Sequence, residues 1–400
     1  MMAAKINPHQ IKESRIKLLH SVKRVVIKIG SGVLTKANGL NLAVINNLTK
    51  DICCLIEDGI EVIIVSSGAI AAGLKKVGLS KRPQSISQQQ AVAAIGQSSL
   101  MIAYEKAFQQ HRKQKIAQIL ITRDDLTHRR RYLNARNTLF TLLAWNIVPI
   151  INENDTVVVD EIKFGDNDNL SAMITNLSEA QLLVNLTNID GLFDMDPREH
   201  ENAVLINVVE KVDRKVTKYA NSIPGFLGTG GMTSKIKAAR KVALAGVPTI
   251  IANGLKPDII KLVFSGESEG TIFLPEKVTL CRRKHWIAFT KYPKGEILID
   301  SGAENALLDN GKSLLPSGIK DVKGRFSKGD TVILLNEDLN KIAIGMVNYH
   351  SSAIKKIMGF NSDMIYSKLG FKDNDEVIHR ENLVLTDKID EGDDGCYSMK

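Results

Sequence analysis

The chain has 400 residues, of which 44% are hydrophobic, and a formal net charge of +9, so two or three domains with sizeable cores are expected. No run approaches about 18 apolar residues and the N-terminus lacks the apolar segment of a secretory signal, so we expect neither a membrane span nor secretion. The four cysteines show no Cys-x-x-Cys spacing, which argues against a disulfide framework and a zinc site. A cytoplasmic location is the simplest interpretation. The basic balance permits attraction to nucleic acid or to anionic metabolites and does not choose between them.

Residues 1–22 are interpreted as an N-terminal extension. From Val25 onward, apolar strands rich in β-branched residues alternate with runs of helical spacing. The segments that predict strands, some with the turn that follows, are VVIKIG, EVIIVSSGAIAAG, AQILIT, NIVPIIN, QLLVNLTN and GVPTIIANG. Continuous apolar strands that alternate with helices are typical of a parallel sheet covered on both faces. We therefore predict one α/β domain over residues 23–276, with a mostly parallel sheet and helices on both faces.

The pattern of apolar segments and turn residues changes after Pro275. Short segments separated by turn residues follow, at the spacing of a small all-β unit: RRKHWIAF, GEILIDSGA, LLPSGIKDV, GDTVILLN and KIAIGMVNY. A helix-like piece comes next, from Ser351 to Met358. We expect a linker over residues 277–292, a small β-rich domain over 293–372 and a charged C-terminal tail over 373–400.

Two glycine-rich turns have the composition of phosphate-binding loops. In Lys28–Gly32, glycines let backbone N–H groups approach a phosphate and Lys28 adds positive charge. Thr35 stands where a dinucleotide fingerprint requires Gly or Ala, so that interpretation fails. Gly228–Lys235 joins three glycines, three hydroxyls and a lysine to a helix-like run, although it is not a Walker A motif. The alternatives are a plain strand-end turn and a flexible glycine linker.

Three further turns are rich in small polar side chains. Ser66–Ala69 opens a helix and can hold a carboxylate or phosphate, or its serines can simply cap the helix. Asn152–Asp155 directly follows an apolar strand, where an Asx turn is the alternative. In Gly165–Ala172, Asp168 can orient lysines electrostatically while Asn167 offers both a donor and an acceptor. A solvated turn is the alternative for this loop.

The sequence lacks the motifs of several other catalytic chemistries. The sequence contains no HExxH, no Cys/His cluster and no nucleophile elbow. The basic run His128–Arg131 is interpreted as a solvated helix face, with an anion or partner contact as the alternative. Two lysines on phosphate-type loops together with an acidic organiser favour phosphoryl transfer by positioning and charge neutralisation.

Seven motifs give the chain a family resemblance: KIGSGVLT, VSSGAIAAG, ITRDDL, YLNARNT, VPIINENDTV, GDNDNLSA and GTGGMTSK. In this order they resemble the gamma-glutamyl kinase (glutamate 5-kinase) family of the amino-acid kinase superfamily. The similarity runs from about residue 23 to 372. Its later part, with GEILIDSGA and SLLPSGIKDVKGRFSKGD, resembles a PUA domain.

The resemblance implies an activity and a set of site residues. ATP would phosphorylate the side-chain carboxylate of L-glutamate, giving L-glutamyl 5-phosphate, the first step of proline biosynthesis. The catalytic positions of the family fall on Lys28, Lys235 and Asp168. Its glutamate-binding positions fall on Ser67, Asp155 and Asn167, with Asp155 meeting the substrate ammonium. Its nucleotide-binding positions fall on Lys28, Thr187, Asn188, Thr229, Gly230, Gly231, Met232, Thr233, Ser234 and Lys235.

The resemblance also implies partners. Mg²⁺ would be held mainly by the ATP phosphates, so no protein metal ligand is expected. Proline would act as feedback inhibitor, and a homo-tetramer or homodimer is expected. The chain departs from the family at Asn188, where an Asp is usual, and at Ser66, where a Thr is more usual. The alternatives are another kinase of the superfamily, acting on aspartate, acetylglutamate or a nucleotide, and an RNA-binding PUA protein, for which we expect weak or no binding.

Overall fold

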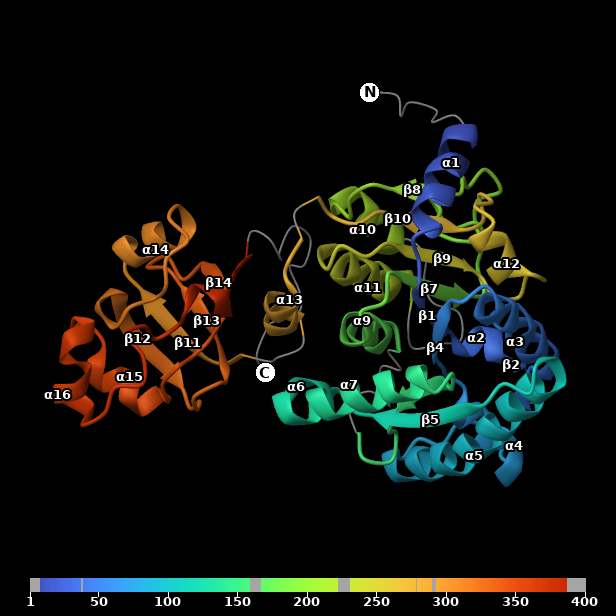
Figure 1. Cartoon of the computed structure of the whole chain (residues 1–400), viewed down its shortest axis with the longest axis horizontal. Helices are drawn as coiled ribbons and strands as arrows, with labels where there is room; N and C mark the ends of the chain where they lie inside the picture. Colours follow the sequence, from blue (N-terminus) through green and yellow to red (C-terminus); the bar gives the residue numbers. More distant parts are fainter. Residues whose placement is uncertain are drawn as a thin grey trace. The chain divides into compact units, whose positions relative to one another are not determined.

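The computed structural model describes residues 8–36, 39–158, 167–221, 231–277, 279–289 and 293–386. The chain divides into two compact units, Met1–Thr279 and Leu280–Lys400 (Figure 1). Among the described residues, no helix combines the length and the apolar character needed to cross a membrane.

The first unit is built on a sheet with the strand order β5-β6-β4-β1-β7-β9-β10-β8. Its strands are β1 (Arg24–Ile29), β4 (Glu61–Val65), β5 (Ile116–Ile121), β6 (Val148–Glu153), β7 (Leu182–Thr187), β8 (Val208–Val209), β9 (Thr249–Asn253) and β10 (Thr271–Phe273). Six neighbouring pairs run parallel, and β10 runs antiparallel to β9. The predicted mostly parallel sheet is confirmed, and each of the predicted strand segments overlaps one of these strands.

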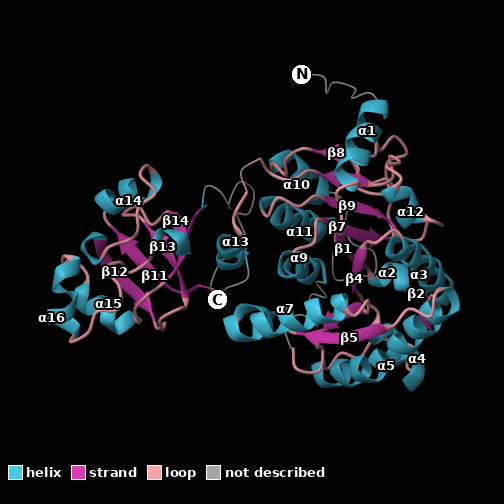
Figure 2. Cartoon of the chain, viewed as in Figure 1, coloured by secondary structure: helices cyan, strands magenta, loops and turns pink. Residues whose placement is uncertain are grey.

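Helices cover both faces of this sheet, as Figure 2 shows. One face packs against α3 (Leu42–Glu57), α5 (Ile86–His111) and α12 (Ile259–Phe264), and the other against α7 (Arg129–Ala144), α9 (Asn167–Ser178) and α11 (Met232–Leu244). Along β1, Val25 and Ile27 lie in the first core and Val26 in the second. Successive strand side chains alternate between faces, so Lys28 projects to the face of α9 and α11.

The remaining elements of this unit are short, apart from the first helix. They are α1 (Pro8–Leu19), α2 (Ser31–Leu34), α4 (Ala69–Val77), α6 (Arg123–Thr127), α10 (Arg214–Asn221) and the hairpin strands β2 (Thr35–Lys36) and β3 (Gly39–Leu40). The helix α1 lies in the predicted N-terminal extension and is anchored by Arg15, which is buried. Its guanidinium donates to the backbone carbonyls of Asn207, Glu267, Glu269 and Gly270. These carbonyls precede β8 and β10, so Arg15 ties α1 to the edge of the sheet.

Two glycines bring α4 and α5 into close contact. A Cβ on Gly96 of α5 would lie 1.8 Å from the carbonyl oxygen of Ala69, and one on Gly73 of α4 would lie 1.9 Å from that of Val92. Real Cβ atoms do not approach an oxygen so closely, so the two backbones can meet only because both positions lack a side chain. The start of α4, next to Ser66 and Ser67, is thereby fixed against α5.

The second unit has a five-stranded sheet with the order β12-β11-β13-β14-β15. Its strands are β11 (Pro293–Ile299), β12 (Ile319–Gly324), β13 (Thr331–Leu335), β14 (Lys341–Met346) and β15 (Leu383–Leu385). Its helices are α13 (Arg282–Phe289), α14 (Ser301–Leu308), α15 (Ser351–Ile357) and α16 (Ile365–Leu369), with single 3-10 turns η1 (Pro316–Gly318), η2 (Ser362–Met364) and η3 (Arg380–Asn382). The predicted small β-rich unit is confirmed.

One predicted segment of this unit is wrong. RRKHWIAF was expected among the short segments of an all-β unit, but it forms the helix α13. Its consecutive residues His285, Trp286 and Ile287 are all buried, and α13 packs against β14 and β15. A short continuous apolar run has no periodicity that separates a strand from a buried helix, so packing decides its structure.

Candidate active site

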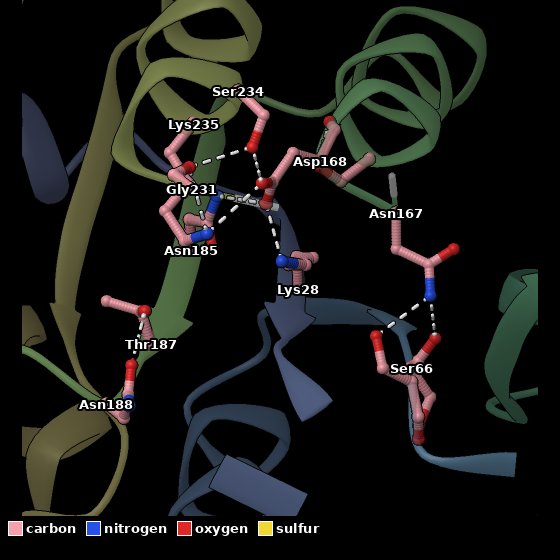
Figure 3. Close-up of polar contacts among 12 residues, drawn as sticks. Lys28, Ser66, Asn167, Asp168, Asn185, Thr187, Asn188, Gly231, Ser234 and Lys235 are labelled. Carbon is pink, nitrogen blue, oxygen red and sulfur yellow. Dashed lines mark hydrogen bonds and ion pairs between the residues drawn. The ribbon is translucent and has the colours of Figure 1, made fainter. Parts of the chain in front are cut away.

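The carboxylate of Asp168 is the centre of a buried polar cluster. Asp168 lies in the first turn of α9 and is fully buried. Its Oδ1 accepts hydrogen bonds from Lys28 Nζ at 2.5 Å and from Asn185 Nδ2 at 2.9 Å. Its Oδ2 accepts from Ser234 Oγ at 2.6 Å and from Lys235 Nζ at 3.2 Å (Figure 3). The carboxylate therefore holds two ammonium groups, one on each oxygen.

Strand register places Lys28 beside Asn185. The two residues are partners in the parallel pairing of β1 with β7, and both strands are central in the sheet. Lys28 precedes the last residue of β1, so its ammonium lies near the carboxyl end of the strand. A residue at the end of a buried strand can reach a ligand at the sheet edge while its stem stays in the core.

Lys235 and Ser234 reach the cluster from the first turn of α11, whose N-cap is Gly231. Ser234 Oγ also lies 2.9 Å from the carbonyl oxygen of Gly231, which competes with Asp168 for its one proton, and Lys235 Nζ lies 3.5 Å from the same oxygen. The N-terminus of a helix attracts anions, because its first N–H groups have no partner within the helix. Lys235 thus adds its positive charge to a helix end that already favours an anion.

The protonation state of Asp168 follows from its surroundings. Burial raises the pKa of a carboxyl group, but the charges of Lys28 and Lys235, together with hydrogen bonds from Lys28 and Ser234, outweigh that penalty. The pKa of Asp168 is therefore held well below its ordinary range. Asp168 stays ionised at neutral pH and compensates one of the two lysine charges, so the trio carries a net charge of +1.

A second polar cluster surrounds Asn167, the residue before Asp168. Asn167 Nδ2 donates to the carbonyl oxygen of Ser66 and to Ser67 Oγ, both at 2.8 Å, and to Asn152 Oδ1 at 3.2 Å. Figure 3 shows Asn167 turned towards Ser66, away from the lysines that Asp168 holds. The parallel pairing of β4 with β6 places Ser66 near Asn152, and Ser66 N donates to Ile151 O at 2.8 Å. Two successive residues of α9 thus serve two adjoining clusters.

Asp155 lies in the segment that follows β6. Asn154 N donates to Ile121 O at 3.2 Å, and Val157 N donates to Asn154 O at 3.2 Å, which closes a turn around Asp155. Asp155 is partly exposed and lies three residues after Asn152. The segment that carries Asp155 thus continues directly from the strand that carries Asn152, a member of the Asn167 cluster.

Thr187 and Asn188 lie at the carboxyl end of β7. Thr187 Oγ1 donates to Asn188 Oδ1 at 3.4 Å. A Cβ on Gly32 would lie 3.4 Å from Asn188 Cγ, so the glycine loop after β1 runs beside Asn188. These residues therefore lie at the carboxyl ends of β1 and β7, the two strands that carry Lys28 and Asn185.

Most of the predicted site residues fall into three groups. Lys28, Asp168, Ser234 and Lys235 meet around the Asp168 carboxylate in the lysine cluster, Ser67 and Asn167 meet in the amide cluster, with Asp155 in the segment after β6, and Thr187 and Asn188 lie at the end of β7. Gly231, Met232 and Thr233 form the start of α11, where the Met232 side chain is buried in the core. Thr229 and Gly230 lie outside the described residues.

Sequence reasoning missed two members of these clusters, Asn185 and Asn152. Asn185 lies within a predicted strand and Asn152 within a predicted polar turn, and the sequence alone assigns neither to the site. A single amide inside an otherwise apolar buried strand was the available signal for Asn185, because a buried amide needs partners. Its Nδ2 finds Asp168, whereas its buried Oδ1 has no hydrogen-bond partner among the described residues.

The donors of the lysine cluster are ammonium, amide and hydroxyl groups around one carboxylate. In the part of the chain that the structure describes, no group of three or more His, Cys, Asp or Glu could hold a metal ion. Such surroundings fit a phosphate chain, whose own oxygens can carry a hard cation such as Mg²⁺.

Comparisons with known proteins identify relatives for both units. The sequence profile of the amino acid kinase family matches residues 23–253, and that of the PUA domain matches residues 295–367. The glutamate 5-kinase of Geobacter sulfurreducens is 52% identical over 372 residues, which cover 93% of this chain and 100% of that relative. The glutamate 5-kinase of Syntrophus aciditrophicus is 49% identical over 375 residues, with 94% and 97% covered.

Two solved structures with lower sequence identity also match part of the chain. The UMP kinase of Bacillus anthracis has a TM-score of 0.45 and 16% identity, covering 64% of this chain and 97% of its own. The carbamate kinase of Giardia lamblia bound to AMP-PNP has a TM-score of 0.46 and 13% identity, covering 64% and 99%. The full-length relatives are therefore the informative comparison.

Proposed function

The chain belongs to the amino acid kinase family, and we propose that it transfers the γ-phosphoryl group of ATP to the γ-carboxylate of L-glutamate. The products are ADP and L-glutamyl 5-phosphate, and the reaction is the first step of proline biosynthesis. The observation that supports this most is the buried Asp168 carboxylate that holds two lysines beside a cluster of amides and hydroxyls. The names of the curated relatives support glutamate as the acceptor.

Lys28 and Lys235 supply the positive charge that this reaction needs. A glutamate side chain has a pKa of about 4.3, so it is already ionised at neutral pH and needs no general base. The barrier lies in bringing two anions together, which requires cations and aligned donors around the transferring group. An ammonium group has three N–H donors, so Lys28 and Lys235 can each hold Asp168 and also bind a phosphoryl oxygen. Asp168 sets the direction of both ammonium groups.

The amide cluster binds the acceptor. The hydroxyl of Ser67 and the amide of Asn167 hold the amino acid, and Asp155 pairs with its ammonium group. Because Asn167 and Asp168 are consecutive in α9, a substrate bound by Asn167 lies beside the lysines that Asp168 directs. This adjacency supports a substrate position in which the γ-carboxylate can approach the phosphoryl group.

The nucleotide binds at the carboxyl ends of β1 and β7 and at the start of α11. The N-terminus of α11 and the Lys28–Gly32 turn receive the phosphates, and Thr187 and Asn188 contact the rest of the nucleotide. A Cβ on Gly30 would lie 3.2 Å from Leu186 O, a tight contact, and 3.8 Å from Lys28 Nζ, so Gly30 lets the turn after β1 pass close to β7 beside Lys28. Mg²⁺ bound with ATP supplies further charge neutralisation on the phosphates.

The experiment measures ADP release from ATP and Mg²⁺ with L-glutamate, L-aspartate, N-acetylglutamate or UMP as acceptor. We expect glutamate to give turnover that exceeds the other acceptors by at least about 100-fold, since the binding groups must match both ends of the amino acid. Turnover with another acceptor and none with glutamate would overturn the proposal in favour of that kinase of the family.

Three further properties belong to the proposal. Proline acts as feedback inhibitor, the enzyme forms a homo-oligomer, and it works in the cytoplasm. Titration of glutamate turnover with proline tests the first, and sedimentation at several protein concentrations tests the second. RNA binding through the PUA domain stays a prediction of weak or no binding, which filter binding at two salt concentrations checks.

A further inference from the structure

The helix α5 presents three polar side chains at intervals of seven residues: Gln90, Gln97 and Tyr104. Seven residues make nearly two helical turns, so the three side chains form one stripe along the helix. Gln97 contacts the strand β6, and Gln90 and Tyr104 contact the segments that follow β6 and β4, all on the acceptor side of the site. Gln90 Nε2 donates to Val158 O at 3.3 Å, Asn152 Nδ2 donates to Gln97 Oε1 at 3.2 Å, and Tyr104 OH lies 3.0 Å from Ser66 Oγ.

The hydrogen bond to Gln97 determines how the side-chain amide of Asn152 is oriented. Asn152 Nδ2 is a donor and needs the acceptor that Gln97 Oε1 supplies. Asn152 Oδ1 is thereby turned inward, where it accepts from Asn167 Nδ2 at 3.2 Å and from Glu153 N at 2.9 Å. If the Asn152 amide were inverted, its N–H groups would face those donors and the bonds would be lost.

The oriented amide of Asn152 in turn orients the side-chain amide of Asn167. Its Nδ2 already faces three acceptors, namely Ser66 O, Ser67 Oγ and Asn152 Oδ1. Its Oδ1 therefore lies on the opposite side of the Cβ–Cγ bond, in the same amide plane, and is presented as an acceptor. An acceptor at this place suits an ammonium group, which offers N–H donors and no lone pair.

We propose that Gln97 is a positioning residue for the amino-acid substrate. Its Oε1 fixes the Asn152 amide, which fixes the Asn167 amide with its carbonyl oxygen towards the substrate ammonium. The inference rests on the proposed function and deepens it, because it names the device that orients the acceptor site. The helix that carries Gln97 is itself held in place, because α5 packs closely against α4 at Gly73 and Gly96.

The test compares two substitutions at Gln97 in steady-state assays that vary glutamate and ATP separately. Gln97→Leu removes the acceptor, so the KM for glutamate should rise about tenfold. The KM for ATP and kcat should change less than about threefold, because the lysine cluster is untouched. Gln97→Glu restores an oxygen acceptor in either protonation state, so its KM for glutamate should lie within about threefold of the wild-type value.

A matched control and a second variant keep the test decisive. Gln110→Leu makes the same exchange on the exposed side of α5 and should leave all three constants unchanged. If Gln97→Leu does not fold, as judged by thermal melting, Gln97→Met replaces it, because Met keeps the length of the side chain and its helix propensity without an amide.

Each outcome bears on a different claim. A KM for glutamate that is unchanged in Gln97→Leu or Gln97→Met, with active wild-type enzyme, would overturn the inference alone. A uniform loss of kcat and thermal stability in both Gln97→Leu and Gln97→Glu would also overturn it, in favour of a purely structural role. Wild-type enzyme with no glutamate turnover would overturn the proposed function, and the inference with it.

Discussion

Replacing Asp168 by Asn tests the lysine cluster, because the exchange preserves shape and removes one charge. Asp168 is fully buried and accepts from Lys28, Lys235, Asn185 and Ser234. The variant leaves two buried ammonium groups without a counter-charge, and its amide N–H groups face donors on one side or the other. Breaking a buried ion pair by removing one partner costs about 3–5 kcal/mol.

The expected loss is large enough to measure in two ways. About 4 kcal/mol corresponds to a fall in Tm of about 10 °C for a unit of this size. The ammonium groups also lose their direction, so kcat should fall about 100-fold or more. Thermal melting and the ADP-release assay measure both effects. Asp124→Asn is the matched control, because Asp124 is exposed and its pair with Arg131 at 3.2 Å is worth little.

The lowered pKa of Asp168 predicts how the stability that this residue contributes changes with pH. The pKa of Asp168 is lowered in the folded protein, so its ionisation contributes stability that is present above the unfolded pKa of about 3.9. Below that value, each pH unit removes about 1.4 kcal/mol of the contribution until the folded pKa is reached. The stability gap between wild type and Asp168→Asn should therefore be larger at about pH 7 than at about pH 3 in urea titrations. A gap of equal size at both pH values, or a Tm unchanged at neutral pH, would refute the reasoning.

Three further substitutions test other parts of the molecule. Lys235→Met should lower kcat about 1,000-fold while the protein remains folded, and Lys241→Met on the same helix should change it less than about threefold; equal rates in both would contradict the role of Lys235. Arg15→Met removes the guanidinium hydrogen bonds to four carbonyls and should cost about 2–4 kcal/mol in urea unfolding, whereas the exposed pair of Lys12 should contribute less than about 1 kcal/mol in Lys12→Met. Gly96→Ala forces α4 from α5 and should raise the KM for glutamate several-fold; a KM like that of the exposed Ser98→Ala control would contradict the coupling of the helix contact to the acceptor site.

The sequence predicts the sheet well because its strands are buried on both faces. Continuous apolar runs such as those of β6 and β7 are typical of strands that are covered on both sides, and the glycines and polar residues after them mark the edge of the sheet. The helix α13 was misassigned because its short apolar run has no distinctive period. Its structure depends on packing against strands that lie more than 50 residues away along the chain.

The site is only partly visible in the sequence, because its hydrogen bonds join distant residues. Asp168 and the lysines stood out as charges beside glycine-rich turns. Asn185 did not, since its partner Asp168 lies 17 residues away. The stripe on α5 offered a signal, because Gln97 and Tyr104 recur at a spacing of seven residues. The orientation of amides cannot be read from residue types, however, since it is decided by the network as a whole.

The most direct measurement follows oxygen from the acceptor to phosphate. L-Glutamate labelled with ¹⁸O in its γ-carboxylate is incubated with the enzyme, ATP, Mg²⁺ and hydroxylamine, which traps the acyl phosphate as a hydroxamate. If the γ-carboxylate attacks the γ-phosphorus between Lys28 and Lys235, breakdown of the acyl phosphate transfers one labelled oxygen into each phosphate released. Phosphate without label, released at the same rate as ADP, would show that water is the acceptor and would contradict the proposed reaction.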